Sequence, residues 1–352
     1  MRTPQLSNLF LGLIATAVLF AFSCKKDDEE NIPGGVNPPP VHTTTPYELN
    51  IPDYFPRFIV PDFNPTTVEG VALGKRIYYD KMLSLGGPLQ GKSCGSCHQQ
   101  ENSFSSPKTG TQVLAHVNLN YTNYFLWNGG KEGSLEDVCL FEISEFFQAD
   151  ISLFQQDSTY KRMMYNAFGV VNFDENEMAF ALAQWFRSLN SFNSKFDLFW
   201  EDKIDLNPLE EMGYLIFNSE KGDCFHCHSF PLMADHNFHN IGLDSIFNGE
   251  NLGRFAVTND ESDLGRFKSP TLRNIALTAP YMHDGRFQTL EEVIEHYNSG
   301  VKNSPSLDAI MTKPGKENGL NLSDVDKAAL LAFLKTLTDT SFINNPEHAN
   351  PF

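Results

Sequence analysis

Two short segments of the sequence carry cysteine and histidine at the same spacing. Residues 94–98 read CGSCH and residues 224–228 read CFHCH, so in each a histidine directly follows the second of two cysteines. Two thiols at this spacing can add across the vinyl groups of one haem, and the adjacent histidine can then ligate the iron. The segments therefore predict two covalently attached haems c. The predicted haem-binding residues are Cys94, Cys97, His98, Cys224, Cys227 and His228.

Three other kinds of site use paired cysteines, and each fits less well. A zinc site built from two such corners does not require a histidine after each second cysteine. A thioredoxin-like dithiol needs a βαβ context, whereas apolar residues here recur at helical spacing. A disulfide across two residues closes a very small loop and stabilises little. Haem attachment is the interpretation that accounts for the histidine in both copies.

The elements that must position these segments are predicted to be helices. In residues 174–191, Met178, Leu182, Trp185 and Leu189 recur at intervals of four, three and four, which is one face of an amphipathic helix. A helix, a short loop and a CxxCH segment occur twice, about 130 residues apart. The sequence therefore predicts a mainly α fold with two similar domains.

Helix starts in the second half of the chain support this view. Asn207 offers an N-cap, Pro208 suits the first helical position and Glu210 completes a capping box. Ser323 precedes another start of the same kind, which leads into an Ala- and Leu-rich run.

The N-terminus is predicted to be a targeting segment. Residues 9–22 are apolar, follow one early charge at Arg2 and stop at Cys24, and they are too short for a comfortable membrane span of about 20 residues. The pattern resembles a bacterial lipoprotein signal, with residues 1–23 removed and Cys24 lipidated. An ordinary secretory signal and a retained anchor are the alternatives. All three export the chain, so we predict a periplasmic or cell-envelope lipoprotein held to the membrane through Cys24.

Composition divides the chain into predicted parts. The residues after the signal are charged and then rich in proline and glycine, which is typical of a tether. About 330 residues follow the signal, more than a single core usually supports. The predicted parts are a signal peptide at 1–23, a flexible tether at 24–62, an N-terminal domain at 63–205, a C-terminal domain at 206–342 and a tail at 343–352.

The chain is strongly acidic, which restricts its partners. Its formal net charge of −18 becomes −19 once residues 1–23, whose single charge is Arg2, are removed. We expect no nucleic acid as partner, because nucleic acid is a polyanion. A basic electron-transfer protein would suit this surface, and so would the plainer interpretation that charge keeps an exported protein soluble. The sequence leaves a homodimer open.

Longer segments resemble the bacterial di-haem cytochrome c peroxidase and MauG family. LGKRIYYDKMLS before the first pair, YFLWNGG at 124–130 and above all the segment at 267–300 carry the resemblance, which spans roughly residues 65–340. It implies two cytochrome c-like domains around a calcium ion. The haem of His98 would handle hydrogen peroxide, and the haem of His228 would take electrons from a small cytochrome or cupredoxin. The implied activity is reduction of hydrogen peroxide to water.

The resemblance also implies roles for single residues. Trp127 corresponds to the tryptophan that relays electrons between the haems. Tyr297 stands where MauG-like members have a tyrosine ligand to the second iron, and Met282 is the fallback ligand. The calcium ion would take the backbone carbonyls of Thr278 and Pro280.

Several positions depart from the peroxidase pattern. The WDGR signature is WNGG at 127–130, and the asparagine expected at the calcium ion is Gln112. The acidic residue that assists O–O cleavage falls at Gln148, which cannot shuttle a proton as a carboxyl can. Glu145 or Glu142 would substitute if the loop is shifted.

These departures keep two alternatives open. One is a di-haem electron-transfer or redox-sensing protein without peroxide turnover, indicated by Gly130 and Gln148. The other is MauG-like oxidation of a partner protein, indicated by Tyr297. A distal histidine for the first haem would fall at Leu114, and nearby His116 is interpreted as a hydrogen-bonded core residue.

Overall fold

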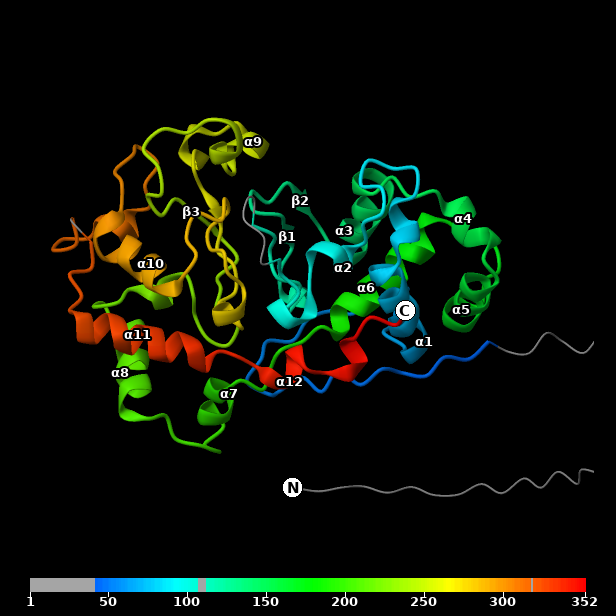
Figure 1. Ribbon diagram of the computed structural model, residues 1–352, viewed down its shortest axis with the longest axis horizontal. Helices are drawn as coiled ribbons and strands as arrows, with labels where there is room; N and C mark the ends of the chain where they lie inside the picture. Colours follow the sequence, from blue (N-terminus) through cyan, green and yellow to red (C-terminus); the bar gives the residue numbers. More distant parts are fainter. Residues whose placement is uncertain (1–41, 107–111, 318) are drawn as a thin grey trace, which may run out of the picture. The chain divides into compact units, whose positions relative to one another are not determined.

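The computed structural model describes residues 42–106, 112–317 and 319–352 (Figure 1). The predicted signal peptide and Cys24 lie outside the described residues. Within these ranges no helix is both long and apolar enough to cross a membrane. Regular structure is mostly helical, and the strands of the described chain form two small antiparallel pairs. The predicted mainly α fold is confirmed.

The first half of the chain is built on the pair α1 and α6, with α3 packed on α6 and α5 packed on α1. Its strands pair Tyr124 with Glu132. The elements of this half are α1 (Val68–Tyr79), α2 (Cys94–Cys97), β1 (Tyr124–Phe125), β2 (Lys131–Glu132), α3 (Leu135–Phe141), α4 (Ile151–Gln156), α5 (Ser158–Phe168) and α6 (Glu175–Ser188).

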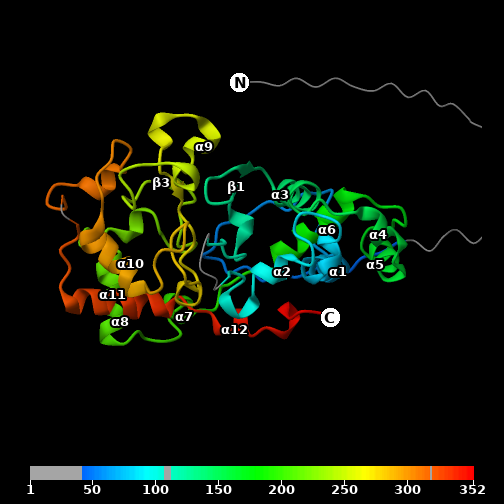
Figure 2. The ribbon, with the colours of Figure 1, turned by 45° about the horizontal axis from the view of Figure 1, so that its top comes forward.

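The second half is built on the pair α8 and α11, with α10 against α11 (Figures 1 and 2). Its strands pair Phe238 with Lys268. The elements of this half are α7 (Lys195–Trp200), α8 (Pro208–Phe217), β3 (Phe238–His239), α9 (Phe255–Thr258), β4 (Phe267–Lys268), α10 (Leu290–Glu295), α11 (Asp324–Thr336) and α12 (Thr340–Ile343).

The two helix pairs have the same close approach, which supports an internal repeat. A Cβ on Gly74 of α1 would lie 2.0 Å from the Ala181 carbonyl oxygen of α6. A Cβ on Gly213 of α8 would lie 2.0 Å from the Ala329 carbonyl oxygen of α11. Glycine is therefore required at the crossing point of each pair, because any side chain would force the helices apart.

The predicted helix starts are confirmed in detail. The Asn207 side chain accepts hydrogen bonds from the backbone N–H groups of Leu209 and Glu210, and Pro208 is the first residue of α8. The Ser323 side chain accepts from the Asp326 N–H at the start of α11. The four apolar residues that predicted the helix of 174–191 are all buried.

Each half has its own hydrophobic core. One cluster of buried residues runs from Val71 to Leu189 and also contains Phe342, and the other runs from Phe196 to Leu337. Apart from Phe342, the first cluster ends at Leu189 and the second begins at Phe196, whereas the predicted domain boundary lies at 205/206.

The predicted tether and the predicted tail both contribute to this packing. Within the predicted tether, the part from His42 onward is ordered by its aromatic residues: Phe55 is buried and its ring packs on Phe192. Within the predicted tail, His348 is buried against Phe104 and Trp185 of the first half. The contacts of Phe55 were not predicted because the segment is rich in proline. The contacts of His348 were not predicted because its partners lie far along the chain.

Candidate functional site

The two CxxCH segments are held by short helical turns. Cys94 to Cys97 form α2, whose first turn is closed by a capping box between Ser93 and Ser96. Cys224 to His226 form a 3₁₀ turn. All four cysteines are free thiols, so the structure has no disulfide that competes with haem attachment at these positions.

Both histidines are oriented in the same way. His98 Nδ1 lies 2.9 Å from the Phe104 carbonyl oxygen, and His228 Nδ1 lies 3.0 Å from the Met233 carbonyl oxygen. When Nδ1–H donates to a carbonyl, Nε2 carries the free lone pair, which is the arrangement of a metal-ligating imidazole. Burial lowers the pKa of His98 to about 4, which keeps the ring neutral and able to bind a metal.

One cavity of about 800 Å³ is lined by both segments. Most of its wall is apolar, and residues of both halves contribute. Trp127, Met282 and Tyr297 line it, as do Thr278 and Pro280, so the structure brings these predicted site residues to one cavity. Phe125 of β1 and His239 of β3 both line the cavity, and Figure 1 shows that these strands come from different halves of the chain.

Buried polar groups on the cavity wall lack protein partners. The Lys268 side chain is buried, and burial lowers its pKa to about 8; within the described residues its ammonium group forms no ion pair. Among the described residues, neither ring nitrogen of His236 has a hydrogen-bond partner. The Lys268 ammonium and the one N–H of a neutral His236 ring are buried donors that need an acceptor. The carboxylates of haem would supply one, so the residues present fit two haems.

Trp127 is fixed by both halves of the chain. Its indole Nε1–H donates to the Gln112 carbonyl oxygen at 2.6 Å, and its own carbonyl oxygen accepts from the Lys268 N–H at 2.8 Å. Arg254 of the second half donates to the Gly129 carbonyl oxygen at 2.8 Å. The indole is therefore held in one orientation at the cavity wall.

Tyr297 lies beside the second cysteine pair. It sits on a π-helical turn, His296–Gly300, that continues α10. Burial, and then the nearby thiols of Cys227 and Cys224, raise the pKa of the Tyr297 hydroxyl. Met282, the fallback ligand, also lines the cavity and has a left-handed backbone with φ 71°.

The three residues predicted for proton transfer differ in whether they reach the cavity. Gln148 is exposed and has φ 52°, and the Glu145 carboxylate is exposed and lies 3.5 Å from Lys131 Nζ. Of the described residues in this segment, neither of these two lines the cavity, whereas Glu142 does. Burial raises the pKa of Glu142 to about 7, although Lys131 acts to lower it.

His116 is buried and hydrogen-bonded, as the sequence predicts. Its Nδ1 lies 3.2 Å from the Tyr78 hydroxyl. The sequence does not show that its ring also stacks on His98, with ring centroids 3.5 Å apart and an angle of 14° between the planes.

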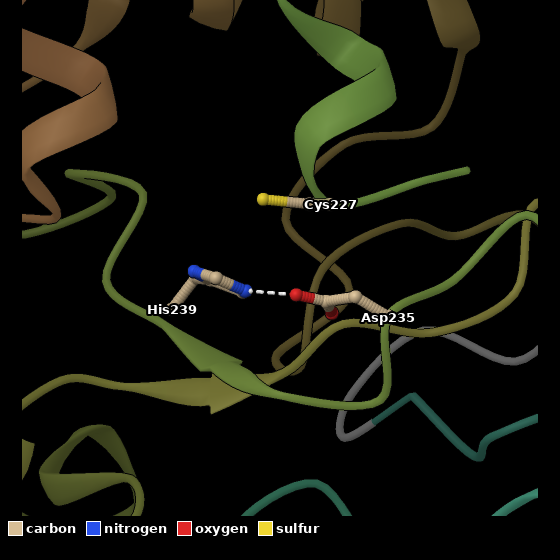
Figure 3. A group of neighbouring side chains, drawn as sticks. All are labelled: Cys227, Asp235 and His239. Atoms are coloured by element: carbon tan, nitrogen blue, oxygen red, sulfur yellow. Dashed lines mark hydrogen bonds and ion pairs between the residues drawn. The ribbon is translucent and has the colours of Figure 1, made fainter.

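A group of three potential metal ligands lies near the second segment, and Figure 3 shows it. Cys227, Asp235 and His239 each bring one ligand atom to within 4.8 Å of the others. His239 lies between Asp235 at 2.9 Å and Asp308 at 2.7 Å. Burial alone would lower the pKa of His239, but hydrogen bonds to the two carboxylates raise it to about 11. A protonated ring cannot ligate, so this group is a partly buried charge beside Cys227. The sequence analysis missed it.

The predicted calcium ligands adjoin Gln112. Its Nε2 donates to the Thr278 carbonyl oxygen at 2.7 Å and to the Ser105 hydroxyl at 3.0 Å. Its Oε1 is buried and has no hydrogen-bond partner among the described residues. Amide and backbone carbonyl oxygens are ligands for a hard cation, but here the Thr278 carbonyl accepts from the Gln112 N–H, so the amide would have to turn over to place Oε1 beside it.

Known proteins resemble this chain along most of its length. The family described as di-haem cytochrome c peroxidase matches residues 68–205. The methylamine utilization protein MauG of Methylorubrum extorquens is 32% identical over 298 residues, which cover 79% of this chain and 80% of that protein. The cytochrome c551 peroxidase of Nitrosomonas europaea is 28% identical and covers 78% of this chain and 81% of its own length.

Solved structures agree with these relatives. A MauG-like protein associated with microbial copper homeostasis is 30% identical, with a TM-score of 0.77, and the match covers 87% of this chain and 99% of that one. The diheme peroxidase BthA of Burkholderia thailandensis is 18% identical, with a TM-score of 0.60, covering 86% of this chain and 96% of that one, and shares the fold.

Covalent attachment can be tested at single cysteines. We expect the denatured chain to retain two haems by mass spectrometry, because thioether bonds survive unfolding. Cys224→Ala together with Cys227→Ala should leave one haem, and Cys139→Ala, which removes a buried thiol outside both segments, should leave two. Two haems retained in the double variant would contradict the assignment.

Proposed function

The chain belongs to the di-haem cytochrome c peroxidase and MauG family and is an oxidoreductase of that class; from this premise we propose that it reduces hydrogen peroxide to water with electrons from an external donor. The observation that carries the proposal is the single cavity lined by both CxxCH segments and by Trp127. When bound, the haems supply two irons, which together can deliver the two electrons that peroxide reduction needs.

Different residues of the chain have different roles in the proposed reaction. His98 and His228 present neutral imidazoles to the irons, each held by a backbone carbonyl. Electrons enter at the His228 side, and Trp127 carries them toward the His98 side. Its indole is held by the Gln112 carbonyl oxygen, and its backbone carbonyl is bonded to Lys268 of the second half. The apolar wall excludes water, which protects the reacting groups from side reactions. Lys268 and His236, which line the cavity, would pair with the haem carboxylates.

The proposed electron donor is a small basic protein such as a cytochrome or cupredoxin. The net charge of −18 supports this choice, because opposite charges speed the encounter of two proteins.

A second candidate function uses the same site. MauG-like oxidation of a partner protein is favoured by Tyr297, which lies beside Cys224 and Cys227. A tyrosine ligand would stabilise ferric iron and lower the potential of the second haem, whereas Met282 would raise it.

Trp127→Phe tests the electron relay. In the reduced-dye assay of the haem-loaded protein, we expect peroxide consumption to fall at least about tenfold, which corresponds to about 1.4 kcal/mol of barrier, because a phenyl ring has no N–H to anchor it and is harder to oxidise. Trp200→Phe is the matched control, since Trp200 lies on α7 and is half exposed. Equal rates in wild type and Trp127→Phe would contradict the relay. No consumption in wild type, with both irons six-coordinate, would favour an electron-transfer or sensing protein.

A calcium ion held near Gln112, Thr278 and Pro280 is the next part of the proposal. Dialysis against a chelator should lower the thermal midpoint of the holoprotein, and added Ca²⁺ should restore it, because the ion would cross-link the two halves. Gln112→Leu should abolish this response. Gln155→Leu is the control: it also removes an amide that donates to a backbone carbonyl, at 2.6 Å, elsewhere in the first half. An unchanged midpoint on chelation would count against calcium.

Export and anchoring complete the proposal. The apolar run at 9–22 and the cysteine at 24 support a lipoprotein signal, and attachment of c-type haem takes place outside the cytoplasm. The mature protein should begin at Cys24, carry lipid and sediment with membranes. Cys24→Ser should release it, and a wild-type chain recovered without lipid would contradict the anchor.

A further inference from the structure

We propose that Glu142 is the proton-transfer residue of the peroxide-handling site, in the role that the sequence pattern would give to position 148. This inference rests on the proposed peroxidase function and adds to it a residue that acts on the substrate.

Glu142 stands where an α-helix changes to a π-helical turn. α3 ends at Phe141 and continues as a π-helical turn over Glu142–Phe146, closed by a hydrogen bond from the Phe147 N–H to the Glu142 carbonyl oxygen at 2.9 Å. Val138, Glu142 and Phe146 are spaced four residues apart, which places them on one side of a helix. All three line the cavity.

The carboxyl of Glu142 lies near the first haem-attachment site. Of the cavity-lining residues described before position 205, Glu142 is the one with a carboxyl group. Burial, and then the charge of Glu142, raise the pKa of the Cys94 thiol. The Glu142 carboxyl is thus close enough to the Cys94 thiol for their charges to interact. Glu142 lies on the π-helical turn, whereas His98 follows α2.

The groups around Glu142 set its protonation. Cys94 of α2 and Cys139 of α3 face it inside, and Lys131 of β2 faces it from outside. Lys131 Nζ also lies 3.7 Å from the centre of the Phe141 ring and pairs with exposed Glu145. With a pKa of about 7, Glu142 is present in both protonation states at neutral pH, which suits a group that must accept and then donate a proton.

The proposed step moves one proton within the substrate. The Glu142 carboxylate accepts the proton of the peroxide oxygen that binds, and the resulting carboxylic acid donates it to the other oxygen. The O–O bond then breaks, and that oxygen leaves as water. The external donor supplies two electrons and the solvent two protons, so that hydrogen peroxide, two electrons and two protons give two waters.

Fluoride binding to the ferric holoprotein tests the proposal without turnover. A neutral Glu142 would donate a hydrogen bond to bound fluoride, whereas the carboxylate would repel it. We expect the affinity of wild type to fall about tenfold per pH unit above the pKa of Glu142, because one proton is then taken up with each fluoride. Glu142→Gln should flatten this dependence, and Glu142→Asp, which keeps a carboxyl, should retain it.

Glu132→Gln is the matched control, because Glu132 is an exposed carboxylate on β2 beside Lys131. It should keep the wild-type pH dependence and the wild-type rate of peroxide consumption, whereas Glu142→Gln should lower that rate by about 10²-fold or more. The same fluoride slope in wild type and Glu142→Gln would overturn the role of Glu142 alone. No fluoride binding by wild type at any pH would mean that no iron is open, which overturns the peroxidase function as well.

Discussion

The buried ion pair between Arg273 and Asp197 fixes the frame on which the cavity depends. The guanidinium donates to both carboxylate oxygens at 2.8 and 2.9 Å, and both side chains are almost fully buried. Burial alone would raise the pKa of Asp197, but the hydrogen bonds and charge of Arg273 lower it. Removal of one partner from such a pair typically costs about 3–5 kcal/mol, because the other charge stays buried.

This pair matters because of where its residues lie in the chain. Asp197 belongs to α7, which links the two cores, and Arg273 belongs to the loop that follows β4. Arg273 also donates to the carbonyl oxygens of Ser191 and Pro231. One side chain therefore joins the linker to the segment that carries the second haem ligand.

The sequence predicted those features that are determined by interactions between residues close together in the chain. The caps at Asn207 and Ser323 and the periodic residues of 174–191 act within one or two helical turns, so each could be identified from a short stretch. The CxxCH segments are equally local, because two thiols and an imidazole must meet one haem. The close helix contacts at Gly74 and Gly213 were not predicted, because they involve Ala181 and Ala329, which lie far along the chain.

What the sequence did not predict depends on distant contacts or on a change in helical register. The burial of Phe55 and His348 comes from partners more than 130 residues away in the chain. The stacking of His116 on His98 and the pairing of His239 with Asp308 also require the folded loops. The peroxidase pattern led to Gln148, which is exposed, whereas Glu142 lines the cavity.

The residues proposed for electron transfer and for proton transfer lie on different elements of the fold. Trp127 meets the second half of the chain through Lys268, and Gln112 meets it through Thr278, so in the proposed relay electrons would cross at that wall. Glu142 belongs to the first half and is near Lys131, which pairs with exposed Glu145. In the proposed mechanism a proton would therefore enter from the surface without passing Trp127. Position 148 has no carboxyl, and Glu142, which lines the cavity, brings one there.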